Sequence, residues 1–219
     1  MNSEHRYSKG ATILGFFLSF GVGAAAMRLT DGHKLSAPQG GAQATAEQRP
    51  TTSLASTTKP GAVRADLYVM SQCPFGVQAE TAFKEVVAKF GDELDLHVEF
   101  IGNAAPTGEL SSLHGPNEVK GDSYQVCAAR YAPAKSFDFI LCQNENSKEV
   151  ATNGEACAKR LGLPADKITA CAEGPEGKEL LKASFKRAQQ AGAQGSPTMI
   201  FEGNKYEGSR KSIDLDRKS

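Results

Sequence analysis

The amino-acid sequence predicts an α/β fold, and three features of its pattern support this class. Residues 64–100 have the pattern of a strand, a helix and a second strand, residues 118–191 are mostly helical, and residues 198–207 have the pattern of a β-hairpin. A strand–helix–strand unit of this length pairs its strands in parallel, with a right-handed crossover. We therefore expect a parallel βαβ unit, then a helical insertion, and then the hairpin.

The first unit is predicted from the spacing of its apolar residues. Residues 64–70 form a short apolar run bounded by polar residues, which is typical of a buried strand. Apolar residues then recur at helical spacing over residues 75–90; Pro74 suits the first helical turn, and Gly91 suits the end of the helix. Residues 94–100 alternate apolar and polar side chains, which predicts the second strand.

The insertion is predicted to cover about residues 103–192 of a domain that spans residues 63–219. Its helical segments are residues 118–131, 135–146, 149–162 and 176–191, separated by Pro133, residues 144–147 and residues 164–175. After it, residues 198–202 and 205–207 are expected to form two strands joined by a turn at Gly203-Asn204. Because only 11 residues follow Gly208, any further helix must be short or absent. This order of elements is the outline of a thioredoxin-like fold with an inserted helical subdomain.

The N-terminal residues differ in composition from the rest of the chain. Residues 10–27 carry no charge and follow a polar stretch with Arg6 and Lys9, which fits either a membrane anchor or a cleaved signal peptide. A buried core helix is the weaker alternative, because the run is apolar on all sides. Residues 1–28 therefore predict export, which places the folded part outside the inner membrane, in the periplasm or another extracytoplasmic space. Residues 29–62, rich in Ala, Thr, Ser and Pro, are expected to be a flexible linker.

Charge excludes one class of partner. The chain has a net charge of zero, and residues 62–219 carry 19 Lys and Arg against 22 Asp and Glu. No basic cluster points to nucleic acid, and we expect no nucleic-acid partner and no cofactor.

Five cysteines lie in the folded part, and an exported compartment favours disulfides between them. The four in the insertion, Cys127, Cys142, Cys157 and Cys171, allow three pairings. If helical hairpins turn at Pro133 and Pro164, then Cys127 faces Cys142 and Cys157 faces Cys171, which is the pairing we favour. The rival pairs Cys142 with Cys157, and buried free thiols are a third possibility. We therefore expect an α/β, thioredoxin-like fold with an inserted helical, disulfide-bonded subdomain.

Either pairing leaves Cys73 as a free thiol at the junction between the first strand and its helix. Unpaired N–H groups at a helix start stabilise a thiolate, which is the nucleophilic form of a cysteine. A buried structural thiol is the plainer alternative. Thioredoxin-like proteins place a cis-proline beside such a cysteine, where its backbone docks an extended substrate, and Ser196-Pro197-Thr198 matches that position. We predict a cis peptide bond at Pro197 and a substrate site that includes these three residues, Pro74 and Gly76.

Several stretches carry a resemblance to a known family. They are Ser71–Gly76 (SQCPFG), Leu113–Glu118 (LHGPNE), Gln125–Ala128 (QVCA), Phe139–Cys142 (FILC), Cys157 and Cys171–Gly174 (CAEG). Together they resemble the gamma-interferon-inducible lysosomal thiol reductases of the thioredoxin superfamily, over most of residues 64–208. The resemblance implies thiol–disulfide exchange on protein or small-molecule disulfides.

Three positions depart from the family pattern. Gly76 stands where the family has the second cysteine of its Cys-x-x-Cys site, while Ser112 and Val119 replace two further cysteines. The last two changes together look like one lost disulfide. The first affects the mechanism, because Cys73 then has no internal thiol to resolve a mixed disulfide.

We expect an exported thiol–disulfide oxidoreductase that works through Cys73 alone, as a thiol exchanger, isomerase or deglutathionylase. A second thiol would come from the substrate or from a small thiol such as glutathione. Gly76 would keep the helix start open. Gly76→Cys is expected to create or greatly raise dithiol reductase activity. The alternative is a non-enzymatic binding or redox-sensing module. A metal site at Cys73 is a weaker idea, because His97 and His114 are more simply explained as structural residues.

Overall fold

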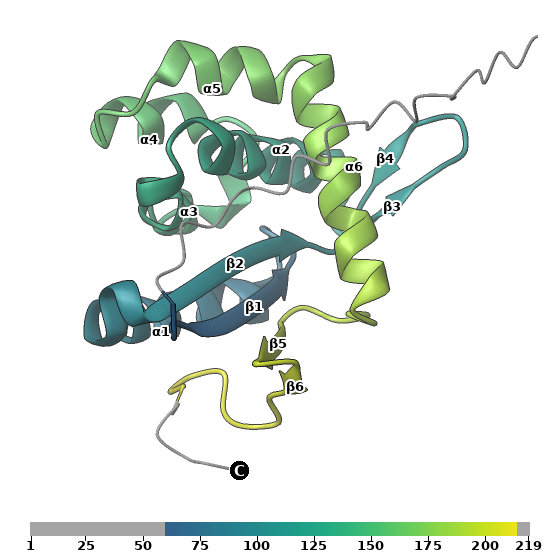
Figure 1. Cartoon of the computed structure of the whole chain (residues 1–219). Coiled ribbons are helices and arrows are strands. Elements are labelled where there is room, and N and C mark those ends of the chain that lie inside the picture. Colours follow the sequence, from purple (N-terminus) through teal and green to yellow (C-terminus); the bar gives the residue numbers. More distant parts are fainter. Residues whose placement is uncertain (1–59, 214–219) are drawn as a thin grey trace, which may run out of the picture. The chain divides into compact units, whose positions relative to one another are not determined.

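The computed structural model of the protein describes residues 60–213 (Figure 1). The predicted export segment and nearly all of the predicted linker lie outside these residues. Strand β1 (Val63–Val69), helix α1 (Pro74–Phe90) and strand β2 (Leu94–Phe100) follow one another, with a 3₁₀ turn at Gly91–Glu93. β1 and β2 pair in parallel from Val63↔Leu94 to Val69↔Phe100. The predicted βαβ unit is therefore confirmed.

The local sequence explains where α1 begins and ends. Pro74 is the first helical residue, a position where the missing N–H costs no hydrogen bond. Gly91 follows the last residue with a φ of +49°, a conformation that glycine adopts most readily. The helix start is consequently fixed one residue after Cys73.

The sheet has the strand order β2-β1-β5-β6, and β5 (Thr198–Phe201) runs antiparallel to β1. β6 (Asn204–Lys205) pairs with β5 through Ile200↔Lys205 and Phe201↔Asn204. The turn therefore lies at Glu202-Gly203, one residue earlier than predicted. Both turn residues have positive φ, 47° and 79°, as a tight hairpin requires, and Gly203 takes the second central position at little cost.

Five α-helices lie between β2 and β5. They are α2 (Pro116–Tyr131), α3 (Ser136–Asn144), α4 (Gly154–Arg160), α5 (Ala165–Ala172) and α6 (Pro175–Gln190), with 3₁₀ turns at Pro133–Lys135 and Ser147–Glu149. Helix α5 was not predicted, because its flanking prolines resemble loop signals. Pro164 instead precedes the first residue of α5, and Pro175 is the first residue of α6. The predicted helix 149–162 is shorter, since a 3₁₀ turn ends at Glu149 and further turns lead to Gly154, where α4 begins.

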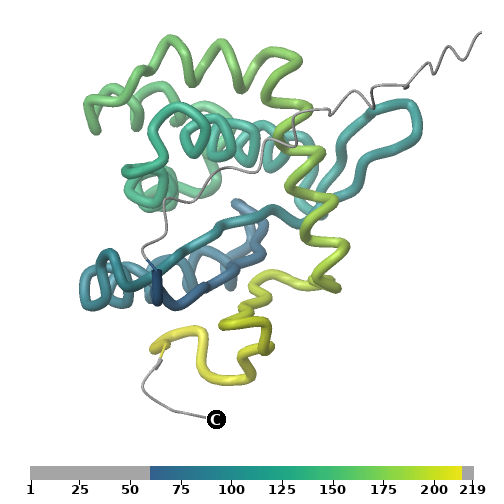
Figure 2. The backbone as a smooth tube through the Cα atoms, viewed as in Figure 1, coloured from purple at the N-terminus to yellow at the C-terminus, as the bar shows by residue number. Residues whose placement is uncertain are grey.

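The helices meet the sheet through a shared core. α2 packs on α5 and α6, α6 packs on β2, and α1 contacts α3. Figure 1 shows α2 to α5 gathered beside the β2 side of the sheet, and Figure 2 shows α6 leading the chain back to β5. A short hairpin that was not predicted, β3 (Asn103–Ala104) with β4 (Leu110–Ser111), packs on α6.

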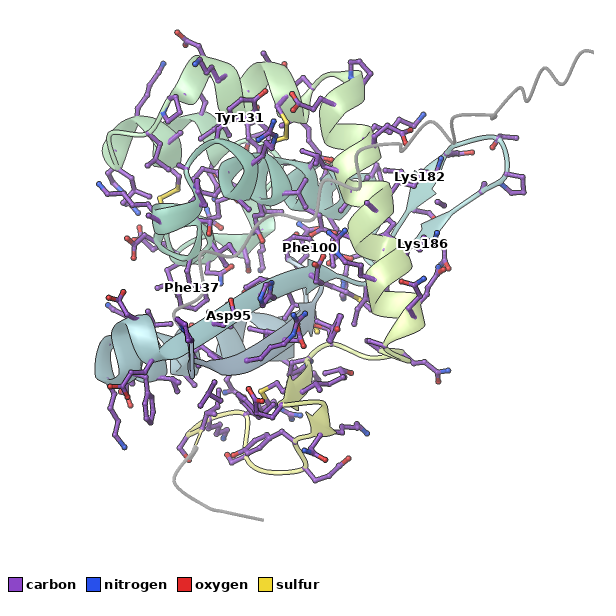
Figure 3. The ribbon with its side chains drawn as sticks, viewed as in Figure 1. Asp95, Phe100, Tyr131, Phe137, Lys182 and Lys186 are labelled. Carbon is purple, nitrogen blue, oxygen red and sulfur yellow. A yellow bond between two sulfur atoms is a disulfide. The ribbon has the colours of Figure 1, made fainter. Side chains whose placement is uncertain are left out.

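One hydrophobic cluster joins the two parts of the domain. It contains Phe83 of α1, Phe100 of β2, Phe139 of α3 and Phe185 of α6, all at most 1% exposed. Phe137 of α3 packs against this cluster. Figure 3 labels both Phe137 and Phe100 close to the sheet. Between residues 60 and 213 no helix has the length and apolar character needed to cross a membrane. No helix follows β6 up to residue 213.

Candidate thiol site

Cys73 lies between the end of β1 and the first residue of α1. It occupies the N-cap position with extended backbone angles, φ −73° and ψ 118°, and makes no side-chain cap. Its backbone N–H donates to the carbonyl of Met70 at 2.9 Å, which closes the turn that leads into the helix. The residue is buried, at 8% exposure, and its sulfur is not in a disulfide. The sequence therefore places one free thiol at the start of a helix, as predicted.

The loop before β5 supplies the other wall of the site. The Ser196–Pro197 peptide bond is cis, which confirms the predicted geometry. The Sγ atom of Cys73 lies 3.5 Å from the carbonyl oxygen of Ser196, within reach of a weak S–H donor bond. The hydroxyl of Ser196 accepts the backbone N–H of Met70 at 3.0 Å. Ser196 thus contacts both Cys73 and the strand end that precedes it.

The other predicted substrate residues differ in how far they are exposed to solvent. Pro74 is exposed at the start of α1, and Thr198 is half-buried at the start of β5, with its hydroxyl donating back to Gly195 at 2.7 Å. Gly76 is buried rather than at an open position. An ideal Cβ on Gly76 would lie 2.5 Å from the Ser196 hydroxyl oxygen and 3.2 Å from the Met70 carbonyl oxygen. The expectation of an open helix start at Gly76 is therefore wrong.

Two buried carboxyl groups of α2 bind the backbone just before Cys73. Glu118 accepts the N–H of Gln72 at 2.9 Å, and Asp122 accepts the N–H of Ser71 at 3.3 Å. Both acidic residues are completely buried. Glu118 and Asp122 are called the α2 carboxyl pair below. Sequence reasoning missed their role, although Glu118 lies within the family-like stretch that it singled out.

Glu118 is also the centre of a wider network. Its Oε1 atom accepts the Ser112 hydroxyl at 2.5 Å and the backbone N–H of His114 at 3.2 Å, and the Nδ1 atom of His114 lies 2.7 Å from its Oε2 atom. A single carboxyl group thus holds the Cys73 loop and the chain that enters α2.

Burial sets the acidity of two carboxyl groups near this site. Loss of hydration raises the pKa of Asp122 well above its usual range, and the neighbouring Glu118 and Glu80 raise it further, while hydrogen bonds from Ser71 oppose the change. Glu80 of α1 is also fully buried, and desolvation raises its pKa from 4.5 to about 7. The amide of Asn144 donates to Glu80 at 2.6 Å, which partly offsets this effect. Burial therefore favours the uncharged form of both acids.

The two histidines considered as metal ligands are already paired with carboxylates. His97 lies 2.8 Å from Asp95, and His114 lies 2.7 Å from Glu118. Across residues 60–213 no three His, Cys, Asp or Glu side chains are grouped as a metal site.

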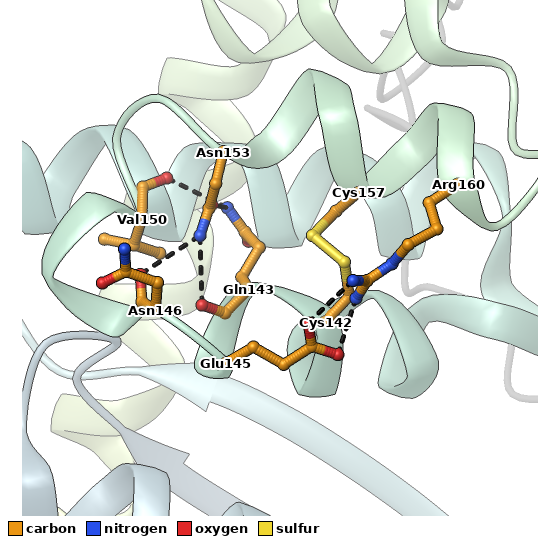
Figure 4. The surroundings of a disulfide bond; sticks show 8 residues. All are labelled: Cys142, Gln143, Glu145, Asn146, Val150, Asn153, Cys157 and Arg160. Carbon is orange, nitrogen blue, oxygen red and sulfur yellow. Dashed lines mark hydrogen bonds and ion pairs between the residues drawn. A yellow bond between two sulfur atoms is a disulfide. The ribbon is translucent and has the colours of Figure 1, made fainter.

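The disulfides pair differently from the preferred prediction. Cys127 of α2 is bonded to Cys171 of α5, with Cα atoms 5.9 Å apart, and Cys142 of α3 is bonded to Cys157 of α4, with Cα atoms 5.8 Å apart. The preferred pairing is wrong and its rival is confirmed, because α2 packs along α5, which brings Cys127 to Cys171. Figure 4 shows the Cys142–Cys157 bridge beside the ion pair of Glu145 and Arg160.

Family models of known proteins agree with the thioredoxin-like fold described above. A family model described as gamma interferon inducible lysosomal thiol reductase (GILT) matches residues 64–161, and one described as a DSBA-like thioredoxin domain matches residues 128–217. No curated protein matches the chain.

Three solved structures are similar in fold. MdbA, a thiol-disulfide oxidoreductase from Corynebacterium diphtheriae, has a TM-score of 0.55 and 15% identity, over 71% of this chain and 82% of its own. Reduced DsbA1 from Neisseria meningitidis has a TM-score of 0.51 and 18% identity, over 70% and 79%. A thioredoxin-like oxidoreductase from Silicibacter pomeroyi DSS-3 has a TM-score of 0.51 and 16% identity, over 72% and 83%. These likenesses confirm the predicted thioredoxin-like fold.

Proposed function

We propose that this chain exchanges disulfides through Cys73 alone, since residues 64–161 match the GILT family model and residues 128–217 match the DSBA-like thioredoxin model. One observation carries this proposal. Cys73 is free at a helix start against the cis-proline loop, while the other four cysteines are joined in two bridges. With Gly76 three residues later, no second thiol of this chain can complete a cycle at this helix start.

The reaction then has two exchange steps. The Cys73 thiolate attacks one sulfur of a substrate disulfide, a new S–S bond forms, and the other substrate sulfur leaves as a thiolate that takes up a proton. A second thiolate, from the substrate or from a small thiol such as glutathione, attacks the mixed disulfide and releases Cys73. When that thiol belongs to the substrate, the sum is an isomerisation with no net oxidation. When it is glutathione, the product is a mixed disulfide between glutathione and the substrate, and a second glutathione that attacks this disulfide completes the reduction of the substrate and leaves oxidised glutathione.

The substrate would lie against the cis-proline loop. Ser196, Pro197 and Thr198 are half-buried, with the Ser196 carbonyl 3.5 Å from the sulfur, and Pro74, next to Cys73 in the chain, is exposed. Phe75, next to Pro74, exposes 53% of its surface, which offers an apolar contact to a polypeptide. Protein disulfides and small disulfides both satisfy the chemistry.

An extracytoplasmic location is part of the proposal. Two disulfides persist best in an oxidising compartment, which supports export. The uncharged residues 10–27 support an export signal or an inner-membrane anchor, with residues 29–62 as the linker.

The test is an isomerase assay on scrambled ribonuclease with the full-length protein in a glutathione buffer. We expect recovery of ribonuclease activity to need both Cys73 and added thiol, and a mass-spectrometric adduct on Cys73 when the thiol is withheld. Cys73→Ser serves as the matched control, because it keeps size and polarity but removes the nucleophile.

Two outcomes would overturn the proposal. One is isomerisation that is unchanged in Cys73→Ser. The other is an adduct on Cys73 that excess thiol does not release, which would favour the alternative of a redox-sensing or binding module.

A further inference from the structure

The chain that follows β6 returns to the start of α1 and places an arginine there. The guanidinium of Arg210 lies over the ring of Phe75, 4.3 Å from the ring centroid. Phe75 is the second residue of α1 and follows Cys73 by two positions. A cationic side chain from the C-terminal segment therefore contacts the helix start that carries the thiol.

The segment around Arg210 is held in place by other side chains. At one end Tyr206 packs edge-on against Phe201, with ring centroids 5.4 Å apart, and at the other end Ile213 packs against the hydrophobic core. Arg210 lies between these two anchors and is exposed. A cation–aromatic contact at an exposed site adds little to such anchoring. Fixing the position of the segment therefore does not require a cation at residue 210.

The guanidinium of Arg210 keeps its hydrogen-bonding groups for a ligand. Within residues 60–213 its side chain forms no hydrogen bond and no salt bridge, and its partner is the ring of Phe75. Because an aromatic ring has no oxygen acceptor, the N–H donors of the guanidinium remain available. A planar guanidinium with available donors binds a carboxylate through two parallel hydrogen bonds.

The charges near this contact favour an anionic ligand. The first turn of α1 has no acidic residue, and residues 209–213 contain Arg210 and Lys211 but no acid. Glu207 precedes this stretch, and its carboxylate is paired with Lys205 at 3.0 Å. A carboxylate that reaches Arg210 therefore meets no competing acid from these two segments.

We infer that Arg210 selects the external thiol that completes the exchange, by binding a carboxylate of that thiol while its sulfur reaches Cys73. The inference deepens the proposed single-thiol function and rests on it. It assigns the second thiol to a chemical class, the small thiols that carry a carboxylate. Glutathione belongs to this class, with carboxylates several bonds away from its sulfur, so one molecule can reach both residues.

The test follows a neutral leaving group on Cys73 in the full-length protein. The Cys73 thiolate attacks dipyridyl disulfide, an S–S bond forms between Cys73 and one pyridinethiol, and the other leaves as pyridinethione after it takes up a proton. Once excess reagent is removed, an added small thiolate attacks the Cys73 sulfur, forms a new S–S bond with it and releases the second pyridinethione. The absorbance of that product gives the rate. The small thiols are glutathione, which is anionic, mercaptoethanol, which is neutral, and cysteamine, which is cationic.

We expect Arg210→Gln to lower the rate with glutathione, relative to the rate with mercaptoethanol, by about two- to fivefold, the factor that one exposed ion pair provides. Arg210→Glu should lower this ratio further and raise the relative rate with cysteamine. Lys211→Gln is the matched control, because it removes one exposed cation at the next residue, and its ratio should stay at the wild-type value. Added salt should lower the ratio of the wild type more than that of Arg210→Gln.

The ratio compares thiols within each protein, so a change in the exposure or intrinsic reactivity of Cys73 cancels. Equal ratios in the wild type and Arg210→Gln, or an equal loss in Lys211→Gln, would overturn the inference while the proposed function stands. A Cys73 that forms no adduct with dipyridyl disulfide would contradict the proposed function and the inference together.

Discussion

The two parts of this domain use cysteine in opposite ways. In the helical insertion, residues 103–192, all four cysteines are joined, because facing helices bring their Cα atoms to 5.9 and 5.8 Å. In the thioredoxin-like part, formed by β1, α1, β2, β5 and β6, the only cysteine is Cys73, and it is free. Its surroundings are a helix start and the cis-proline loop. The comparison teaches that the packing around a cysteine, not its presence, determines whether it is bridged or free.

The two parts are nevertheless connected through buried acids. The α2 carboxyl pair of the insertion binds the N–H groups of Ser71 and Gln72, immediately before Cys73. Glu80 of the thioredoxin-like part is bound in return by Asn144 of the insertion. Substitutions in the insertion therefore fall into two kinds: those that lower the free energy of unfolding and those that change the reactivity of the Cys73 thiol.

The largest effect is expected from removing the Cys127–Cys171 bridge by a double substitution to alanine. This bridge closes 44 residues of sequence, and loop-closure entropy predicts a loss of about 4 kcal/mol in the free energy of unfolding. Urea denaturation measures the loss. Because this bridge joins α2 to α5, away from residues 71–73, the alkylation rate of Cys73 in the native protein should be unchanged. A large change in the alkylation rate would show that this bridge also affects the Cys73 thiol.

Removing the Cys142–Cys157 bridge in the same way should cost less. It closes 15 residues, for which the same relation gives about 3 kcal/mol. The two double variants, measured side by side in urea, should differ by about 1 kcal/mol in that order. The reverse order would show that strain or packing, rather than loop length, determines what these bridges contribute.

The third effect depends on pH and concerns Glu80, at the boundary between the two parts. Its pKa is about 7 in the folded protein against an ordinary value of 4.5, so the folded chain keeps a proton that the unfolded chain releases. The protonated Glu80 stabilises the folded chain in full below pH 4.5, and this contribution to the free energy of unfolding is lost as the pH rises to 7. The loss is at most about 3 kcal/mol, at 1.36 kcal/mol for each pH unit between the two pKa values. Glu80→Gln should remove it.

Urea denaturation of both proteins between pH 4.5 and pH 8 measures this difference, with the Gln variant gaining stability relative to the wild type as pH rises to 7. Asp122 adds a change of the same sign, so the Gln variant should keep some pH dependence. Parallel curves for the two proteins would mean that Glu80 ionises as easily in the folded chain as in the unfolded one.

Local signals in the sequence were sufficient to place Cys73. The end of an apolar strand, a proline suited to a first helical turn and a glycine suited to a helix end all lie within one continuous stretch, and the structure has the strand and helix there. The order of elements around it also followed from local periodicity. One local rule fails: Pro164 and Pro175 predict a loop by their turn preference, but proline is also common at a helix start, which is where both lie.

Relations between distant segments could not be predicted in the same way. The cysteine pairing depends on α2 packing along α5, and no residue near Cys127 encodes that choice. The contact of Gly76 with Ser196 joins residues that only the fold brings together. The α2 carboxyl pair was missed for the same reason, because a buried acid is recognised by what surrounds it rather than by its neighbours in sequence.

The smallest effect, and the sharpest test of how the two parts are coupled, is expected for Glu118→Gln. Its amide NH₂ replaces one acceptor oxygen among the donors of Gln72, Ser112 and His114, so one hydrogen bond is lost, worth about 1 kcal/mol. A loosened loop exposes the buried sulfur but no longer holds it against Ser196. Alkylation of Cys73 should therefore accelerate, by up to about fivefold for that energy, while isomerase activity falls. Asp122→Asn is the matched control: the raised pKa of Asp122 already favours its neutral form, so both rates should change less. If alkylation and isomerisation instead changed together in the same direction, the carboxyl would act on the thiol itself rather than on the position of its loop.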